Sequence, residues 1–86
     1  MFKFDESMYG KQVRFINAKA HEEMPEYYPK VGTIGILIPI KDTNFKWFAD
    51  DYAVQWPKGS TTGTGTDCWL VDEESLELVE EVVDKP

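Results

Sequence analysis

Two short stretches decide how this chain is expected to fold: PKVGTIGILI at residues 29–38 and YAVQWPKGS at residues 52–60. In the first stretch, Ile34, Ile36 and Ile38 recur at every second position, which is the period of a β-strand with two distinct faces. The second stretch begins with alternating large side chains and ends in turn-forming residues. The pair therefore predicts two strands at the centre of a small β-sheet.

Glycine and proline residues mark where the expected strands turn or bend. Pro57 presets φ and Gly59 supplies a left-handed position, so residues 57–60 predict a tight turn. Gly35 interrupts an apolar strand, and an interior glycine indicates a bulge or a close approach of another backbone. Strands that bend in this way are typical of small barrels.

Three further strands are predicted: residues 10–16, a glycine-interrupted segment that begins at 61–66 and continues at 68–70, and residues 76–79. Residues 72–75 predict one helical turn before the last strand. Two long connections, residues 17–30 and 41–51, separate the strands, and the AKAHEE segment of the first favours a helical turn. Five short strands with irregular connections predict a closed or nearly closed barrel in one domain, residues 1–86.

The same residues resemble the pattern of a Src-homology-3-like barrel, and more narrowly that of the mind-bomb/Herc-type domain and of short uncharacterised barrel proteins carried by phages and mobile elements. The matching residues are Gly10, Val13, 31–35, 54–60 and 76–79. The sequence departs from this pattern at residues 41–51, where relatives have a short turn. It implies an all-β fold, a small five-stranded, strongly bent Src-homology-3-like barrel whose two long loops flank one groove.

The composition favours a small protein of a reducing compartment. The chain has 86 residues and a single cysteine, Cys68, so an intrachain disulfide is excluded. A lone thiol is typical of reducing compartments. The first residues, MFKFDE, lack the apolar core of a signal peptide, and no apolar run reaches the roughly 20 residues that a membrane span requires. We therefore expect a cytoplasmic protein without a membrane segment.

The net charge of −7 is concentrated at the C-terminal end of the chain. Residues 67–86 hold eight acidic residues against one lysine, which accounts for the whole net charge. Because nucleic-acid binding depends on Lys and Arg contacts to phosphates, direct binding to nucleic acid is not expected. An acidic segment suits a basic partner and raises the rate of encounter with it. The alternative is that the acidic residues only keep the protein in solution.

The residue types that catalysis needs are scarce. His21 is the only histidine, and Cys68 lies between Asp67 and Trp69, without the basic neighbours of a reactive thiol. Residues 60–66 are rich in glycine and threonine but lack the lysine and the following helix of a phosphate-binding loop. The paired acids are sequence neighbours, which point to opposite faces of a strand and do not converge on a metal. We expect no catalytic residue, metal or cofactor.

Two groups of residues form the predicted partner-binding site. The first consists of aromatic residues in the two long loops: Tyr27, Tyr28, Trp47 and Phe48. The second consists of acidic residues near the C-terminal end: Glu73, Glu74, Glu77, Glu80 and Glu81. Exposed rings beside a groove bind a proline-rich segment, a methylated lysine or an aliphatic anchor. The alternative is that several rings, Phe45 among them, cap a small core.

These features predict a non-enzymatic protein-binding module. Its most specific form is a small acidic inhibitor from a phage or mobile element, of the anti-CRISPR type, which binds a basic, nucleic-acid-handling host protein. The alternative is a structural or accessory subunit that self-associates through the barrel groove. Aromatic loops fit both hypotheses, whereas the concentrated negative charge favours the first.

Overall fold

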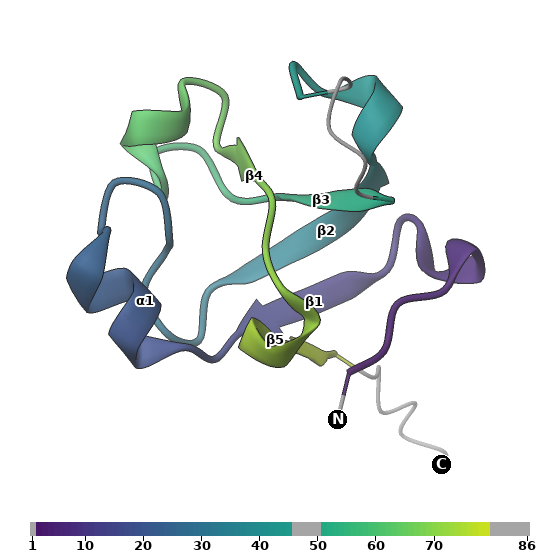
Figure 1. Cartoon of the computed structure of the whole chain (residues 1–86), viewed down its shortest axis with the longest axis horizontal. Helices are drawn as coiled ribbons and strands as arrows, with labels where there is room; N and C mark the ends of the chain where they lie inside the picture. Colours follow the sequence, from purple (N-terminus) through teal and green to yellow (C-terminus); the bar gives the residue numbers. More distant parts are fainter. Residues whose placement is uncertain (1, 46–50, 80–86) are drawn as a thin grey trace, which may run out of the picture.

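Five antiparallel strands form a single sheet in the computed structural model, which describes residues 2–45 and 51–79 (Figure 1). The strands are β1 (Gln12–Phe15), β2 (Ile34–Pro39), β3 (Tyr52–Gln55), β4 (Cys68–Trp69) and β5 (Leu76–Leu78). Their order across the sheet is β4-β3-β2-β1-β5, so the first strand lies between the second and the last. The described part of the chain is all-β apart from one short helix and four 3₁₀ turns, as predicted.

The helical elements are short and lie in the connections. They are η1 (Glu6–Met8), α1 (Ala18–Glu23), η2 (Ile40–Asp42), η3 (Thr62–Thr64) and η4 (Glu73–Ser75). The Asn17 side chain caps α1 by accepting a hydrogen bond from the Ala20 N–H at 3.0 Å, and Pro25 follows the end of the helix. The predicted helical turns in AKAHEE and at residues 72–75 are therefore confirmed. No helix among the described residues is long and apolar enough to cross a membrane.

Strand β2 places its isoleucines outward and its glycine inward. Gly35 and Leu37 are buried, whereas Ile34 and Ile36 keep 38% and 41% of their surface exposed. A Cβ atom at Gly35 would lie 2.6 Å from both Trp56 Cε3 and Val54 Cγ1. The close approach predicted for this glycine is confirmed. The inner face is occupied by the large Trp56 ring, so it needs the smallest residue opposite it.

The core joins the sheet to both ends of the described chain. Its buried members are Phe2, Val13, Phe15, Leu37, Val54, Trp56, Val71 and Leu76. Phe15 and Trp56 meet edge to face, with ring centroids 5.9 Å apart. Phe2 comes from the segment before β1, for which the sequence predicts no element, and it is only 6% exposed. The N-terminal arm, residues 2–9, is thus part of the packed domain.

The connection between β3 and β4 corrects one prediction. The Ser60 N–H donates to the Pro57 carbonyl at 3.0 Å and Gly59 has φ +87°, so the tight turn is confirmed. Residues 61–66, predicted as the start of the fourth strand, instead form η3 and bends, and only Cys68–Trp69 pairs with β3. The cause is Asp67, whose carboxylate accepts the backbone N–H groups of Gly59 and Thr61 at 3.0 and 2.9 Å.

Candidate partner-binding surface

The two long loops converge on Trp69. Tyr27, from the loop after α1, packs on the Trp69 ring with centroids 4.9 Å apart. Phe45, from the loop before β3, meets the same ring edge to face at 5.3 Å. All three side chains are partly exposed. We call these three residues the loop aromatic cluster.

The β3–β4 connection supports this cluster from the side. The Gly63 N–H donates to the Glu26 carbonyl at 2.8 Å, and a Cβ atom at Gly63 would lie 3.2 Å from Tyr27 Cζ. Figure 1 shows η3, drawn in green, beside the loop that follows α1. Three connections therefore hold one set of rings at the end of a rigid sheet, an arrangement typical of binding loops.

The predicted aromatic residues do not all lie in this cluster. Tyr28 stacks on Phe15 with centroids 5.7 Å apart and packs against the core. It therefore caps the core, as in the alternative that several loop rings cover a small core. Trp47 and Phe48 lie outside the described residues. Trp69 was absent from the predicted site because its sequence context indicates only a strand. Its pairing with Val54 sets its position beside the loops.

The predicted acidic residues that the structure describes, Glu73, Glu74 and Glu77, differ in their contacts. Glu77 on β5 forms an ion pair with Arg14 on the neighbouring strand β1. Glu74 is exposed, and Glu80 and Glu81 lie outside the described residues. Glu73 is half-buried, and its Oε2 atom accepts a hydrogen bond from the Phe4 N–H at 2.6 Å. Among the three described acidic residues, Glu73 is thus the one that hydrogen-bonds to the N-terminal arm.

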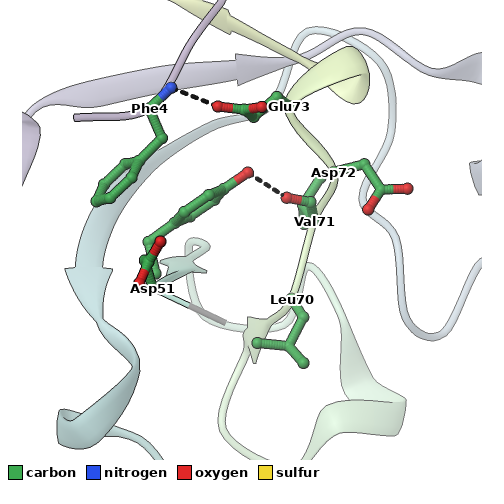
Figure 2. Close-up of a pocket in the computed structure, with 7 residues that line it drawn as sticks. Phe4, Asp51, Leu70, Val71, Asp72 and Glu73 are labelled. Atoms are coloured by element: carbon green, nitrogen blue, oxygen red, sulfur yellow. Dashed lines mark hydrogen bonds between the residues drawn. The ribbon is translucent and has the colours of Figure 1, made fainter. Parts of the chain in front are cut away.

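A second aromatic cluster lies around that contact, and sequence reasoning missed it. Phe4 stacks on Tyr52 with centroids 4.6 Å apart, while Phe2 and Tyr9 pack at the edges of this pair. A cavity of about 360 Å³ opens beside the rings, lined by Phe4, Asp51, Tyr52 and residues 70–73. We call this cavity the N-arm pocket. Figure 2 shows it with its two hydrogen bonds, from the Phe4 N–H to Glu73 and from the Tyr52 hydroxyl to the Val71 carbonyl.

The two side chains considered for nucleophilic chemistry are Cys68, which is buried, and His21, which lies within hydrogen-bond distance of a backbone carbonyl. Burial raises the pKa of the Cys68 thiol to about 11, so the thiol is protonated at neutral pH and is a poor nucleophile. His21 Nδ1 lies 2.8 Å from the Tyr28 carbonyl oxygen, within the helix-to-loop segment. Within residues 2–45 and 51–79, no three His, Cys, Asp or Glu side chains are grouped to hold a metal ion.

No family model matches this chain, and neither a curated protein nor a solved structure matches it.

Proposed function

We propose that this chain is a non-enzymatic protein-binding module on a Src-homology-3-like barrel. The observation that carries the proposal is the loop aromatic cluster, in which both long loops present a ring to Trp69. The strand order supports the barrel class, since β1 lies between β2 and β5 and a 3₁₀ turn leads into β5. The sequence pattern that resembles this class spans the same strands.

Aromatic rings at the meeting point of loops are effective binding anchors. A partly exposed ring offers a large contact area and loses little conformational freedom when a partner covers it. The sheet beneath fixes Trp69 through its pairing with Val54, and the loop rings are positioned on Trp69 in turn. Binding therefore requires little rearrangement of the cluster, which lowers the entropic cost of association.

The net charge of −7 indicates the chemistry of the partner. A chain with this charge attracts basic surfaces over a distance of about one Debye length and repels nucleic acid. The proposed partner is a basic, nucleic-acid-handling protein, and the proposed role is that of a small inhibitor from a phage or mobile element, of the anti-CRISPR type. Such an inhibitor would occupy the surface that the partner offers to nucleic acid.

The test compares the wild type with a Tyr27→Ala/Phe45→Ala variant as bait in a bacterial lysate, at low and high salt. Captured proteins are identified by mass spectrometry and purified, and their affinities are measured by calorimetry. We expect a basic nucleic-acid-binding protein whose affinity falls at least tenfold with the variant. A matched control is Val31→Ala, which removes an exposed apolar side chain from the turn before β2. A partner whose affinity is unchanged by the double variant would contradict the proposal.

A second candidate function is that of a self-associating accessory subunit. The observation in its favour is the outward face of β2, where Ile34 and Ile36 remain exposed. Exposed isoleucines two residues apart on one strand face are suited to contact with another copy. Sedimentation velocity over a hundredfold range of concentration separates the two functions. A dimer that Ile36→Ser dissociates would favour the accessory subunit, whereas a monomer at all concentrations would exclude it.

A further inference from the structure

The N-arm pocket combines an aromatic wall with charge of a single sign. Its wall is the stacked pair of Phe4 and Tyr52, and its volume of about 360 Å³ is sufficient for one long side chain. The acidic residues that line it are Asp51, Asp72 and Glu73, and within residues 2–45 and 51–79 no Lys or Arg lines it. The cavity therefore offers negative charge and the faces or edges of rings within the same small volume.

The surroundings add to the negative character of one rim. Asp51 also lines an adjoining hollow together with Glu6 and Tyr9. Lys41 lines the same hollow and contributes a positive charge. The pKa of Tyr9 is raised by desolvation first, and then by the charges of Glu6, Asp51 and Asp42. The Tyr9 hydroxyl donates to the Asp51 backbone carbonyl at 2.6 Å, which leaves the Asp51 carboxylate available at the rim. Among the described residues that line the two hollows, four acidic residues, Glu6, Asp51, Asp72 and Glu73, outnumber one lysine, Lys41.

A cation with a long apolar stem matches this combination better than any neutral group. Arg and Lys form charge-assisted hydrogen bonds to carboxylates and are attracted to aromatic faces. Their methylene stems pack against apolar side chains, and Leu70 and Val71 line the pocket beside the rings. An anion would be repelled by the acidic residues of the lining, and a purely apolar group would gain no electrostatic attraction from them.

We propose that the N-arm pocket receives an arginine or lysine side chain from a basic segment of the partner protein. This inference rests on the proposed function and adds a second point of contact to it. Trp69 of the loop aromatic cluster and Leu70 of the pocket are sequence neighbours, so the two contacts share one short segment of the chain. The pocket selects a basic partner, and the loop aromatic cluster supplies apolar contact.

The first experiment titrates the full chain with blocked amino acids and follows its backbone amide signals by NMR. The probes are N-acetyl-arginine amide, N-acetyl-lysine amide and N-acetyl-citrulline amide, the last being a neutral analogue of arginine. We expect both cations to shift the amide signals of Phe4, Tyr52, Val71 and Glu73, with a dissociation constant on the order of millimolar. The shifts should weaken at high salt. Equal shifts with citrulline, or no shift at these amides, would overturn the inference.

The second experiment removes one charge from the pocket. In Glu73→Gln, the side-chain oxygen still accepts the hydrogen bond from the Phe4 N–H, but the charge is lost. We expect arginine binding to weaken about three- to tenfold. The matched control, Glu74→Gln, removes the same charge from an exposed neighbour that does not line the pocket. An equal loss of arginine affinity in both variants would indicate a general charge effect and would overturn the proposed role of the pocket.

A third variant covers the case in which Glu73→Gln perturbs the arm. Asp51→Asn removes the charge at the rim and leaves the backbone carbonyl that Tyr9 contacts. It should weaken arginine binding in the same direction as Glu73→Gln, with an unchanged amide spectrum elsewhere. Unchanged arginine affinity in this folded variant would count against the inference.

The two proposals can fail separately. A captured partner that depends on Tyr27 and Phe45, but binds Glu73→Gln and Asp51→Asn at full strength, would overturn the pocket and leave the binding function intact. Arginine binding in the pocket, with a partner affinity that the Tyr27→Ala/Phe45→Ala variant does not change, would support the pocket and contradict the function assigned to the loop aromatic cluster.

Discussion

The two aromatic clusters of this molecule contain the same kinds of side chain but differ in how they are held. The N-terminal arm brings Phe2 into the core and lays Phe4 on Tyr52, with carboxylates around the rings. In the loop aromatic cluster, Tyr27 and Phe45 meet Trp69 from opposite connections and all three stay partly exposed. The first cluster is therefore anchored by the buried Phe2 and borders an open cavity, although its other rings are also partly exposed, whereas the second is presented by loops and has no buried member. The position of a ring in the fold, rather than its presence in the sequence, separates the two roles.

The largest expected effect is on stability and tests whether the arm belongs to the core. Phe2→Ala should lower the free energy of unfolding by about 3 kcal/mol, because it removes a buried ring and leaves a cavity. Tyr27→Ala, in the partly exposed cluster, should lower it by only about 1 kcal/mol. Urea denaturation of both variants measures the difference. Equal losses of unfolding free energy in the two variants would show that both clusters contribute equally to stability.

A smaller effect is expected from one hydroxyl group. Tyr52→Phe removes the hydrogen bond to the carbonyl of the buried residue Val71, 2.6 Å away, and should cost about 1–2 kcal/mol. Tyr27→Phe is the matched control in the other cluster, where the same atom is removed from a partly exposed ring. The urea concentration at the midpoint of unfolding of Tyr27→Phe should equal that of the wild type. A destabilised Tyr27→Phe would show that the loop aromatic cluster also depends on a hydroxyl contact.

The connection beneath the loop aromatic cluster should respond to pH. The backbone N–H groups of Gly59 and Thr61 hold the pKa of the Asp67 carboxyl below its ordinary value. A lowered pKa means that this carboxylate stabilises the fold above the ordinary pKa of aspartate, and that the contribution is lost as the pH falls through the lowered value. Asp67→Asn should reduce Tm by a few degrees at pH 7. Thermal unfolding from pH 7 to pH 2 should show the two proteins converging, and a constant difference would contradict this account.

The smallest expected effect is on the reactivity of one thiol. Cys68 is buried beside Trp69 with a raised pKa, so at pH 8 it should react with a disulfide reagent at least about tenfold more slowly than in the unfolded chain. Binding of arginine in the N-arm pocket should leave this rate unchanged, because Cys68 does not line that pocket. A fast reaction in the folded protein would indicate that the edge of the sheet opens near the loop aromatic cluster.

Local chemistry was enough to predict most of the sheet. The strands at β1, β2, β3 and β5 follow alternation and turn residues, and the turn at Pro57 needs only its own four residues. The close approach of another backbone at Gly35 also followed from a local rule, although the outward exposure of Ile34 and Ile36 did not. Which face of a strand is buried depends on what packs there, and here the Trp56 ring takes the space.

The errors and omissions arose where a side-chain contact that strand periodicity does not reveal decides the conformation, in two cases between residues far apart in the sequence. Residues 61–66 have threonines that favour a strand, but the Asp67 carboxylate takes the backbone N–H groups of Gly59 and Thr61. The N-arm pocket depends on Phe4 and Glu73, 69 positions apart, and no local pattern links them. Trp69 was missed for the same reason, because its neighbours Tyr27 and Phe45 come from other loops.

The pairing of β1 with both β2 and β5 also has a consequence during synthesis of the chain. The Arg14–Glu77 register spans 63 positions, so β1 lacks one of its two neighbours until Glu77 has left the ribosome. Contacts of such long range make folding slow relative to helical domains of similar size. The nascent chain therefore exposes an unpaired edge of β1 from its emergence until residues 76–78 follow, a period in which an early-binding chaperone would have the greatest influence on yield.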